Sequence, residues 1–366
     1  MFCLKSLNQQ EINRLLKRGY DTLVSFDSDK FYSRQIALPE LGRKGQQKLR
    51  RSKVVIIGLG GLGSASSLYL ALAGVGHLRL VDQDTVELNN LHRQLLYSLS
   101  DLRHPKVEAA AKKIHQINPE VKVEPIPENA RRSNIDQIIQ GMNCVVDGLD
   151  NMKTRYLLNR ACAKHEIPYV YGAAIGIEGT LSVFHPPETP CLECVFPNVD
   201  DRYLQTCETR GVLGATAGII GTMQAMETIK LLTGIGETLK GKLMVCDFDD
   251  MNFVTIDIHK RPNCSACKGE TKLRREKERL TWLCGRNTVN VNPPRLTEAP
   301  MEKLHEKLKH HFKILIKSPI VIVFQYSSKV EVSFFQGGRM LIKNVAGEDV
   351  ALKIYEDVWR KLGLKP

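Results

Sequence analysis

Two cysteine pairs give the most specific chemical signal in the sequence. Cys191 and Cys194 form one C-x-x-C pair, and Cys264 and Cys267 form the other. Four thiolates are the ligands that a tetrahedral structural zinc site uses. The pairs lie too far apart along the chain for a local zinc ribbon, so the fold must bring them together. A redox role for one pair is the alternative, and the presence of the second pair disfavours it.

A glycine-rich segment predicts a nucleotide loop. The β-branched residues 54–57 indicate a buried strand, and Gly58, Gly60 and Gly63 after them fit the pattern G-x-G-x-x-G that opens a helix. In this pattern the first glycine permits a tight turn, the second lets backbone approach a phosphate, and the third allows close helix packing. Helix N-terminal N–H groups then face an anion. A strand end whose glycines serve packing alone is the alternative.

Carboxylates follow two of the predicted strands. Asp82 and Asp84 come at the end of HLRLVDQD, where Rossmann-type folds read ribose hydroxyls by hydrogen bonding. Asp150 and Asn151 close the stretch NCVVDGLDN, a further predicted strand. The carboxyl ends of parallel strands form the ligand side of an open sheet, so Asp150 is placed to hold Mg²⁺ on phosphates.

Polar and cationic residues between these carboxylates indicate a triphosphate. Asn90, Arg93 and Lys106 precede or begin a helix that Pro105 nucleates. Two cations aimed at a glycine loop suit the charge of a triphosphate better than that of a dinucleotide. Cations that face solvent on a helix are the alternative.

Cys207 is a second kind of chemical candidate. It lies in a polar stretch beside Glu208 and Arg210, which predicts an exposed loop with a cation that favours the thiolate. An inert surface thiol is the alternative.

Composition excludes several classes of protein. The chain has 366 residues, 43% of them apolar, ten cysteines and a formal charge of +12. No basic run with interleaved aromatic residues and no nucleic-acid module occurs, so a polyphosphate and an acidic protein account for the charge better than nucleic acid does. The N-terminal sequence lacks the apolar core and cleavage site of a secretory signal. We therefore expect a cytoplasmic protein with reduced thiols and neither a membrane nor a nucleic-acid partner.

Alternating strand and helix patterns in the first half predict a Rossmann-like α/β fold with a doubly wound, mostly parallel sheet. The alternation in residues 178–187 predicts an antiparallel extension, and the apolar helix 218–232 is expected to be buried. A charged segment without apolar periodicity separates this part from a small C-terminal α+β domain. The expected divisions are an N-terminal arm with a helix (1–30), the α/β domain (31–268), a charged linker (269–280) and the C-terminal domain (281–366).

Taken together, these residues resemble the ThiF/MoeB/HesA adenylyltransferases, prokaryotic relatives of the ubiquitin-activating enzymes. The resemblance runs from about Phe31 to Lys268. It rests on YSRQIALPELG, VVIIGLGGLGS, LVDQDTVELNNLHRQ, HPKVEAA, DGLDN, CLEC, GVLGATAGIIG with QAMETIKLL, and CSAC. It implies MgATP-dependent adenylation of the C-terminal Gly-Gly carboxylate of a ubiquitin-like or sulfur-carrier protein, with release of pyrophosphate.

The resemblance also implies roles for individual residues. Gly61 lies at the phosphates, Asp82 at the ribose and Asp150 on magnesium. Arg34 corresponds to the arginine that the family donates across a homodimer interface, and Cys207 to a cysteine that several members use in acyl or sulfur transfer. The residues implied to contact the triphosphate are Asn90, Arg93 and Lys106.

The sequence departs from the family pattern at His92, where glutamine is usual, and in the C-terminal domain, which is not the rhodanese domain of some eukaryotic relatives.

Two other functions stay open. A nicotinamide or flavin oxidoreductase shares the glycines and Asp82 but leaves Arg93 and the cysteines unexplained. A non-catalytic scaffold that docks a ubiquitin-like protein leaves the charged set unexplained. The carrier, whether for molybdopterin, thiamin, tRNA thiolation or protein conjugation, is not identified.

Overall fold

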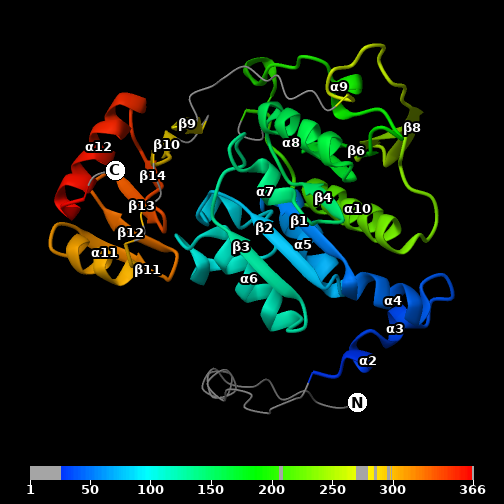
Figure 1. Ribbon diagram of the computed structural model, residues 1–366, viewed down its shortest axis with the longest axis horizontal. Coiled ribbons are helices and arrows are strands. Elements are labelled where there is room, and N and C mark those ends of the chain that lie inside the picture. The colour runs from blue at the N-terminus through cyan, green and yellow to red at the C-terminus, as the bar shows by residue number, and fades with distance from the viewer. Residues whose placement is uncertain are drawn as a thin grey trace, which may run out of the picture.

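The computed structural model describes residues 26–205, 209–268, 279–283, 287–294, 297 and 299–364. These residues form one eight-stranded sheet and one six-stranded sheet. Figure 1 shows the smaller sheet beside the β2–β3 edge of the larger one. The predicted helix within residues 8–18, most of the predicted charged linker and Cys207 lie outside the described residues.

The large sheet has the strand order β3-β2-β1-β4-β5-β6-β7-β8. Its first five strands in this order pair in parallel, and the last three extend the sheet in antiparallel fashion. The strands are β1 (Lys53–Ile57), β2 (His77–Val81), β3 (Lys122–Ile126), β4 (Cys144–Asp147), β5 (Tyr169–Ile175), β6 (Glu178–Phe184), β7 (Lys242–Asp247) and β8 (Asn252–Asp257).

Strand β1 is buried on both faces of this sheet. Its alternate side chains point to opposite faces, so Val54 and Ile56 join one apolar cluster while Val55 and Ile57 join another. The first cluster includes residues of α5, α6 and α10, and the second includes residues of α7 and α8. The helices are α5 (Gly61–Ala73), α6 (Lys106–Ile117), α7 (Ile135–Ile139), α8 (Met152–His165) and α10 (Gly214–Thr233).

The chain reverses its direction of winding at β1, which pairs with β2 on one side and β4 on the other. At such a point the connections diverge and leave a crevice beyond the carboxyl ends of the two strands. The segments that open into this crevice are the glycine loop after β1 and the turn after β4.

Short elements complete this part of the chain. They are α2 (Ser28–Phe31), α3 (Ser33–Ile36), α4 (Gly42–Arg51), η1 (Leu88–Asn90), η2 (Leu99–Asp101), α9 (Leu192–Val195) and η3 (Asp201–Tyr203).

The C-terminal domain is an antiparallel sheet covered by two helices, with strand order β11-β12-β13-β14-β10-β9. Trp359 and Tyr355 of α12 are buried against Phe334 and the other inward residues of the sheet. Its elements are β9 (Leu280–Leu283), β10 (Thr288–Val291), α11 (Met301–Leu308), β11 (Lys313–Lys317), β12 (Val321–Gln325), β13 (Glu331–Phe335), β14 (Met340–Lys343) and α12 (Glu348–Leu362).

The predicted fold class is confirmed, including the antiparallel extension and the small α+β domain. The exact domain bounds stay predictions. Among the described residues, no helix is both long and apolar enough to cross a membrane.

The expectation that helix 218–232 is buried was too broad. Ile220 and Ala225 of α10 are buried, but Ile219 is 38% and Met226 55% exposed. One side of α10 packs on the sheet and on α5, and its opposite side is exposed among the described residues. The apolar sequence of this helix therefore did not show that one of its apolar faces is exposed.

Candidate functional site

The glycine loop and the β4 turn pack backbone against backbone. Gly58 has φ +90° and donates its N–H to Val81 O at 2.8 Å, which ties the loop to β2. A Cβ at Gly63 would lie 1.8 Å from Gly58 O, and a Cβ at Gly148 would lie 2.1 Å from the same oxygen. Only glycine fits at these positions, so the crevice is built on close backbone contact.

Helix α5 presents open backbone donors to this crevice. Its first residue is Gly61 and its N-cap is Gly60, and no side chain caps it. A Cβ at Gly60 would meet nothing nearer than Gly148 O at 4.0 Å, whereas one at Gly61 would lie 2.7 Å from the Ala217 Cβ. The unpaired N–H groups of a helix start bind anions. The loop therefore has the local geometry of a phosphate site.

Asp82 directly follows β2 and accepts hydrogen bonds from two backbone N–H groups, one of which belongs to the glycine loop. Its Oδ2 accepts from Leu59 N and its Oδ1 from Asp84 N, both at 2.7 Å. Burial raises the pKa of the Asp82 carboxyl, and the Lys106 ammonium opposes that shift. Each oxygen retains a lone pair, so this carboxylate can still accept a ribose hydroxyl.

Lys106 is buried beside these carboxylates. Its side chain is 2% exposed, and its Nζ donates to Asp84 Oδ2 at 3.2 Å. Its backbone N donates to Asp84 O at 3.0 Å. The sequence predicted a cation aimed at the phosphates, and the structure shows the Lys106 ammonium held beside Asp82 by Asp84.

Asn90 and Arg93 lie on the segment that follows β2. Asn90 is buried in η1, and its Oδ1 accepts from Glu87 N at 3.1 Å. Arg93 donates to Asn89 O at 2.7 Å, and its Nη1 is 2.7 Å from His92 Nε2. The Arg93 Cδ lies 3.8 Å from a Cβ built on Gly61, which places this side chain beside the glycine loop.

Asp150 and Asn151 follow β4 and differ in their contacts. Asp150 is exposed, and its Oδ1 accepts from Asn151 Nδ2 at 3.1 Å. Asn151 is the N-cap of α8, where its side chain accepts from Thr154 N at 2.9 Å. An exposed carboxylate oxygen is a hard ligand of the kind that Mg²⁺ prefers, so Asp150 fits the predicted ion. Asn151 has a structural contact as well as a position at the crevice.

Sequence reasoning missed the buried network that fixes this turn. Asp147 is fully buried and accepts from Arg155 Nε at 2.9 Å, Tyr169 OH at 2.7 Å and Leu149 N at 2.8 Å. Arg155 also donates to Leu149 O and Gly172 O, at 2.7 and 2.8 Å. The available signal was the first aspartate of DGLDN, which sits at the end of an apolar strand. An aspartate in such a position requires a buried partner.

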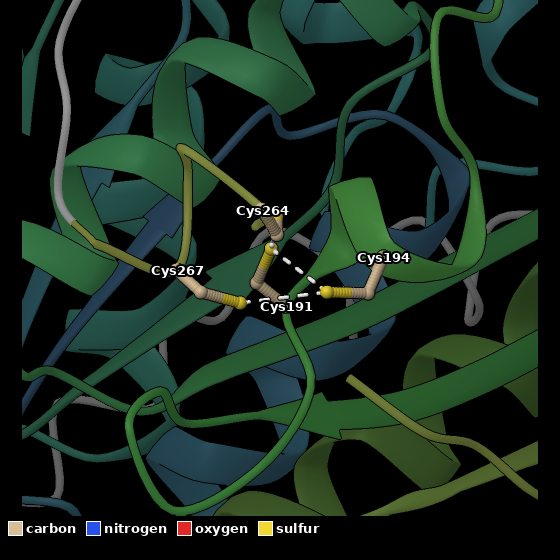
Figure 2. Close-up of side chains that lie close together, drawn as sticks. All are labelled: Cys191, Cys194, Cys264 and Cys267. Carbon is tan, nitrogen blue, oxygen red and sulfur yellow. Dashed lines mark hydrogen bonds between the residues drawn. The ribbon is translucent and has the colours of Figure 1, made fainter. Parts of the chain in front are cut away.

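The predicted cysteines come together at one point in the fold (Figure 2). The four Sγ atoms lie within 4.8 Å of one another. The Cys191–Cys194, Cys191–Cys264 and Cys194–Cys267 sulfur pairs are 3.9, 3.8 and 3.4 Å apart. A tetrahedral ion with bonds of about 2.3 Å needs sulfurs roughly 3.8 Å apart, whereas a disulfide needs about 2 Å. The cluster fits zinc and excludes disulfides between these residues.

Arg34 lies apart from the crevice residues in sequence and in its element. It is exposed on the short helix α3, before β1. The single chain leaves its predicted function across a subunit interface untested. The predicted function of Cys207 is likewise untested, because this residue lies outside the described ranges.

A comparison with protein families gives the class to which this fold and crevice belong. The model of the ThiF family matches residues 32–266, which is well over half of the chain. The chain belongs to the ThiF family. The predicted resemblance is thereby confirmed.

Curated relatives carry names that indicate an activating enzyme. The chain is 38% identical over 313 residues to "Adenylyltransferase and sulfurtransferase MOCS3" of Drosophila sechellia, a match that covers 85% of this chain and 69% of that protein. It is 42% identical over 237 residues to "SAMP-activating enzyme E1" of Haloferax volcanii, with 64% and 87% covered. The match to MOCS3 of Culex quinquefasciatus covers only 58% of that protein. By these likenesses the chain is an enzyme of the ThiF/MoeB adenylyltransferase type.

Solved structures agree with the fold. The crystal structure of E. coli MccB with MccA-N7isoASN has a TM-score of 0.59 at 24% identity, over 65% of this chain and 74% of that one. The structure of PaaA has a TM-score of 0.54 at 22% identity, over 70% and 84%. At such identities the likeness concerns the fold alone.

Proposed function

We propose that this protein uses ATP to adenylate the C-terminal Gly-Gly carboxylate of a ubiquitin-like or sulfur-carrier protein in the cytoplasm. The observation that carries the proposal is the set of groups at the switch point of a ThiF-family fold, where uncapped helix donors, the Asp82 carboxylate and the exposed Asp150 follow neighbouring strands. Names of relatives that refer to adenylyl transfer and SAMP activation support the same substrate class.

The reaction requires positioning and charge compensation more than proton transfer. The carrier carboxylate attacks the α-phosphorus, a new P–O bond forms, and the bond to the β-phosphate oxygen breaks to release pyrophosphate. The nucleophile is already ionised, so no general base is needed. This requirement agrees with a site made of cations, backbone donors and a metal-binding carboxylate.

The chain's own residues divide these tasks. The loop at the phosphates is formed by four glycines, Gly58, Gly60, Gly61 and Gly63. Asp82 holds the ribose. Arg93 lies beside Gly61 and compensates negative charge on the phosphates. Lys106 is held by Asp84, and a bound polyphosphate would compete for its ammonium. Asn90 contacts the phosphates from η1. Asp150, next to Asn151, would hold Mg²⁺, and this ion would neutralise negative charge on the triphosphate.

A homodimer completes the proposal. Tyr69 of α5 and Ile219 and Met226 of α10 are exposed apolar side chains on two helices that pack together. Exposed apolar surface of this kind is typical of an interface with another copy. Arg34 of one subunit would then reach the ATP of its partner.

Carrier-dependent exchange of radioactive pyrophosphate into ATP tests the reaction. Candidate carriers that end in Gly-Gly should support exchange, and truncation of the last glycine should abolish it. Asp150→Ala should lower exchange roughly 100-fold or more, because a lost metal ligand removes several kcal/mol of charge stabilisation. Binding of NAD without ATP-dependent exchange would instead favour an oxidoreductase, and carrier binding without exchange would favour a scaffold.

A thiol at Cys207 would act after adenylation. Acyl transfer from the adenylate forms a thioester and releases AMP, so it needs an accessible sulfur that the first step does not use. Cys207→Ala should leave exchange within a few-fold of wild type and remove a reductant-sensitive adduct with the carrier, as seen by mass spectrometry. An adduct that survives the substitution would assign the function to another cysteine.

A further inference from the structure

Arg339, the residue before β14, crosses from the C-terminal domain to the large sheet. Its Nη2 donates to Gln83 O at 2.9 Å and to Pro127 O at 2.8 Å, in the loops that follow β2 and β3. Its Nη1 donates to Asn290 Oδ1 of β10 at 2.7 Å. One guanidinium therefore joins two strand ends of the α/β domain to the appended sheet.

The contact is buried and electrostatically specific. Arg339 is 4% exposed, and its Cζ lies 3.6 Å from the centre of the Phe335 ring. Burial lowers the pKa of the guanidinium to about 9, and the carboxylates of Asp84, Glu128 and Asp82 oppose that shift. The group is therefore still cationic at neutral pH. The two Nη groups donate three hydrogen bonds, while the buried Nε has no partner among the described residues, so the printed contacts of the Nη groups fix the place of this cation.

Lys343, the last residue of β14, makes a second crossing contact. Its Nζ donates to Thr85 Oγ1 at 2.8 Å and lies 2.7 Å from Glu87 Oε1. Glu87 is the N-cap of η1, and its backbone N donates to Asn90 Oδ1 at 3.1 Å. The contact thus reaches a residue proposed to contact the triphosphate.

The segment that both cations hold, residues 83–87, lies between two parts of the nucleotide site. On one side, Asp84 N donates to the Asp82 carboxylate at 2.7 Å. Asp84 also accepts from Lys106, through its carbonyl at 3.0 Å and its carboxylate at 3.2 Å. On the other side, η1 carries Asn90. A shift of this segment would move Asp82, Lys106 and Asn90 together.

We propose that Arg339 and Lys343 are positioning residues of the nucleotide site, so that the C-terminal domain is a structural part of that site rather than a separate module. The inference rests on the proposed use of ATP. The docked strand β14 holds residues 83–87 in the arrangement that binds the ribose and phosphates. The domain then acts on ATP affinity, and leaves carrier recognition unchanged.

Three variants of the full chain test this inference. Arg339→Met and Lys343→Met remove the crossing hydrogen bonds while keeping most of the side-chain volume. Glu331→Gln is the matched control, because Glu331 lies opposite Lys343 in the β13–β14 pair and makes an exposed crossing pair with Arg103 at 2.8 Å. Such exposed pairs contribute little.

The first readout is affinity for a non-hydrolysable ATP analogue, measured by calorimetry. We expect the dissociation constant to rise about tenfold in Arg339→Met and about threefold in Lys343→Met, and to change less than twofold in Glu331→Gln. In pyrophosphate exchange, KM for ATP should rise in the same order while KM for the carrier stays constant. Arg339→Lys should recover part of the loss because it keeps the charge. Amides of residues 83–90 should exchange hydrogen faster in the two methionine variants.

Wild-type affinity in folded Arg339→Met and Lys343→Met would overturn the inference, and so would equal losses in the Glu331→Gln control. If Arg339→Met does not fold, Lys343→Met decides the matter alone. A wild-type chain that binds the analogue yet supports no carrier-dependent exchange would overturn the proposed reaction, while the comparison of affinities would still test the inference. A chain that binds no nucleotide would overturn both.

Discussion

At the scale of single residues, the two aspartates of DGLDN have different environments and different tasks. Asp147 is fully buried and accepts hydrogen bonds from Arg155, Tyr169 and Leu149, whereas Asp150 is exposed at the crevice. The buried carboxylate fixes the turn that carries the exposed one. The five-residue motif DGLDN therefore contains a structural carboxylate, Asp147, and a candidate magnesium ligand, Asp150.

Replacing Arg155 should destabilise the protein strongly. Arg155→Met leaves the Asp147 carboxylate buried without its cation, and breaking such a pair costs about 3–5 kcal/mol. For a domain of this size, 1 kcal/mol shifts the thermal midpoint by roughly 2–4 °C, so calorimetry should record a fall of about 10 °C.

Two further variants separate charge from packing. Adding Asp147→Asn to Arg155→Met removes the unpaired charge and should recover part of the thermal midpoint. Lys164→Met on the same helix breaks only an exposed pair with Asp136 and should change the midpoint little. If the double variant is no more stable than Arg155→Met, the destabilisation has another cause.

At the scale of elements, the cysteine cluster joins two distant segments. Cys191 is the N-cap of α9 and Cys194 lies within that helix, and Cys264 and Cys267 lie after β8. A metal ion with four thiolate ligands would have no open position for a substrate, so we propose that this cluster is a structural site.

Cys264→Ser should therefore abolish stoichiometric zinc and lower the thermal midpoint by roughly 5 °C or more, because metal binding is coupled to folding. Zinc is measured by atomic absorption after dialysis against a weak chelator. Cys246→Ala is the control, since Cys246 is a buried thiol of β7 outside the cluster. The Cys246→Ala variant should retain stoichiometric zinc. Unchanged zinc and midpoint in Cys264→Ser would refute the site.

The elements also show which features the sequence can predict. Strands β1 and β4 were predictable because their apolar runs are buried on both faces, and the cysteine cluster was predictable because the spacing of the two pairs is itself the signal. The network of Arg155 and the crossing contacts of Arg339 were not predictable. Arg339 contacts residues more than 200 positions away, and Arg155 is a near neighbour of Asp147 in sequence, but an arginine in a sequence does not show which residue it contacts. Similarly, the apolar residues of α10 do not indicate in the sequence which side of the helix is exposed.

At the scale of the whole molecule, the single chain leaves two features unexplained. Apolar side chains of α5 and α10 are exposed, and Arg34 lies exposed on a short helix and forms no ion pair within the part of the chain that the structure describes. A two-fold dimer would cover the apolar surface and allow Arg34 to act at the partner's site. The same dimer would then account for both the exposed apolar surface and the position of Arg34.

Mixing two inactive variants tests that arrangement. In a heterodimer of Arg34→Ala and Asp150→Ala chains, a site that takes Asp150 from one chain and Arg34 from the other has both residues, while the second site lacks both. Random exchange of equal amounts makes half of the dimers mixed, so roughly a quarter of wild-type pyrophosphate exchange should return. If Arg34 acts within its own chain, each site of the heterodimer lacks one residue and no activity returns. Native mass spectrometry of the mixture verifies subunit exchange, which makes the absence of recovery decisive against an arginine that acts across the interface.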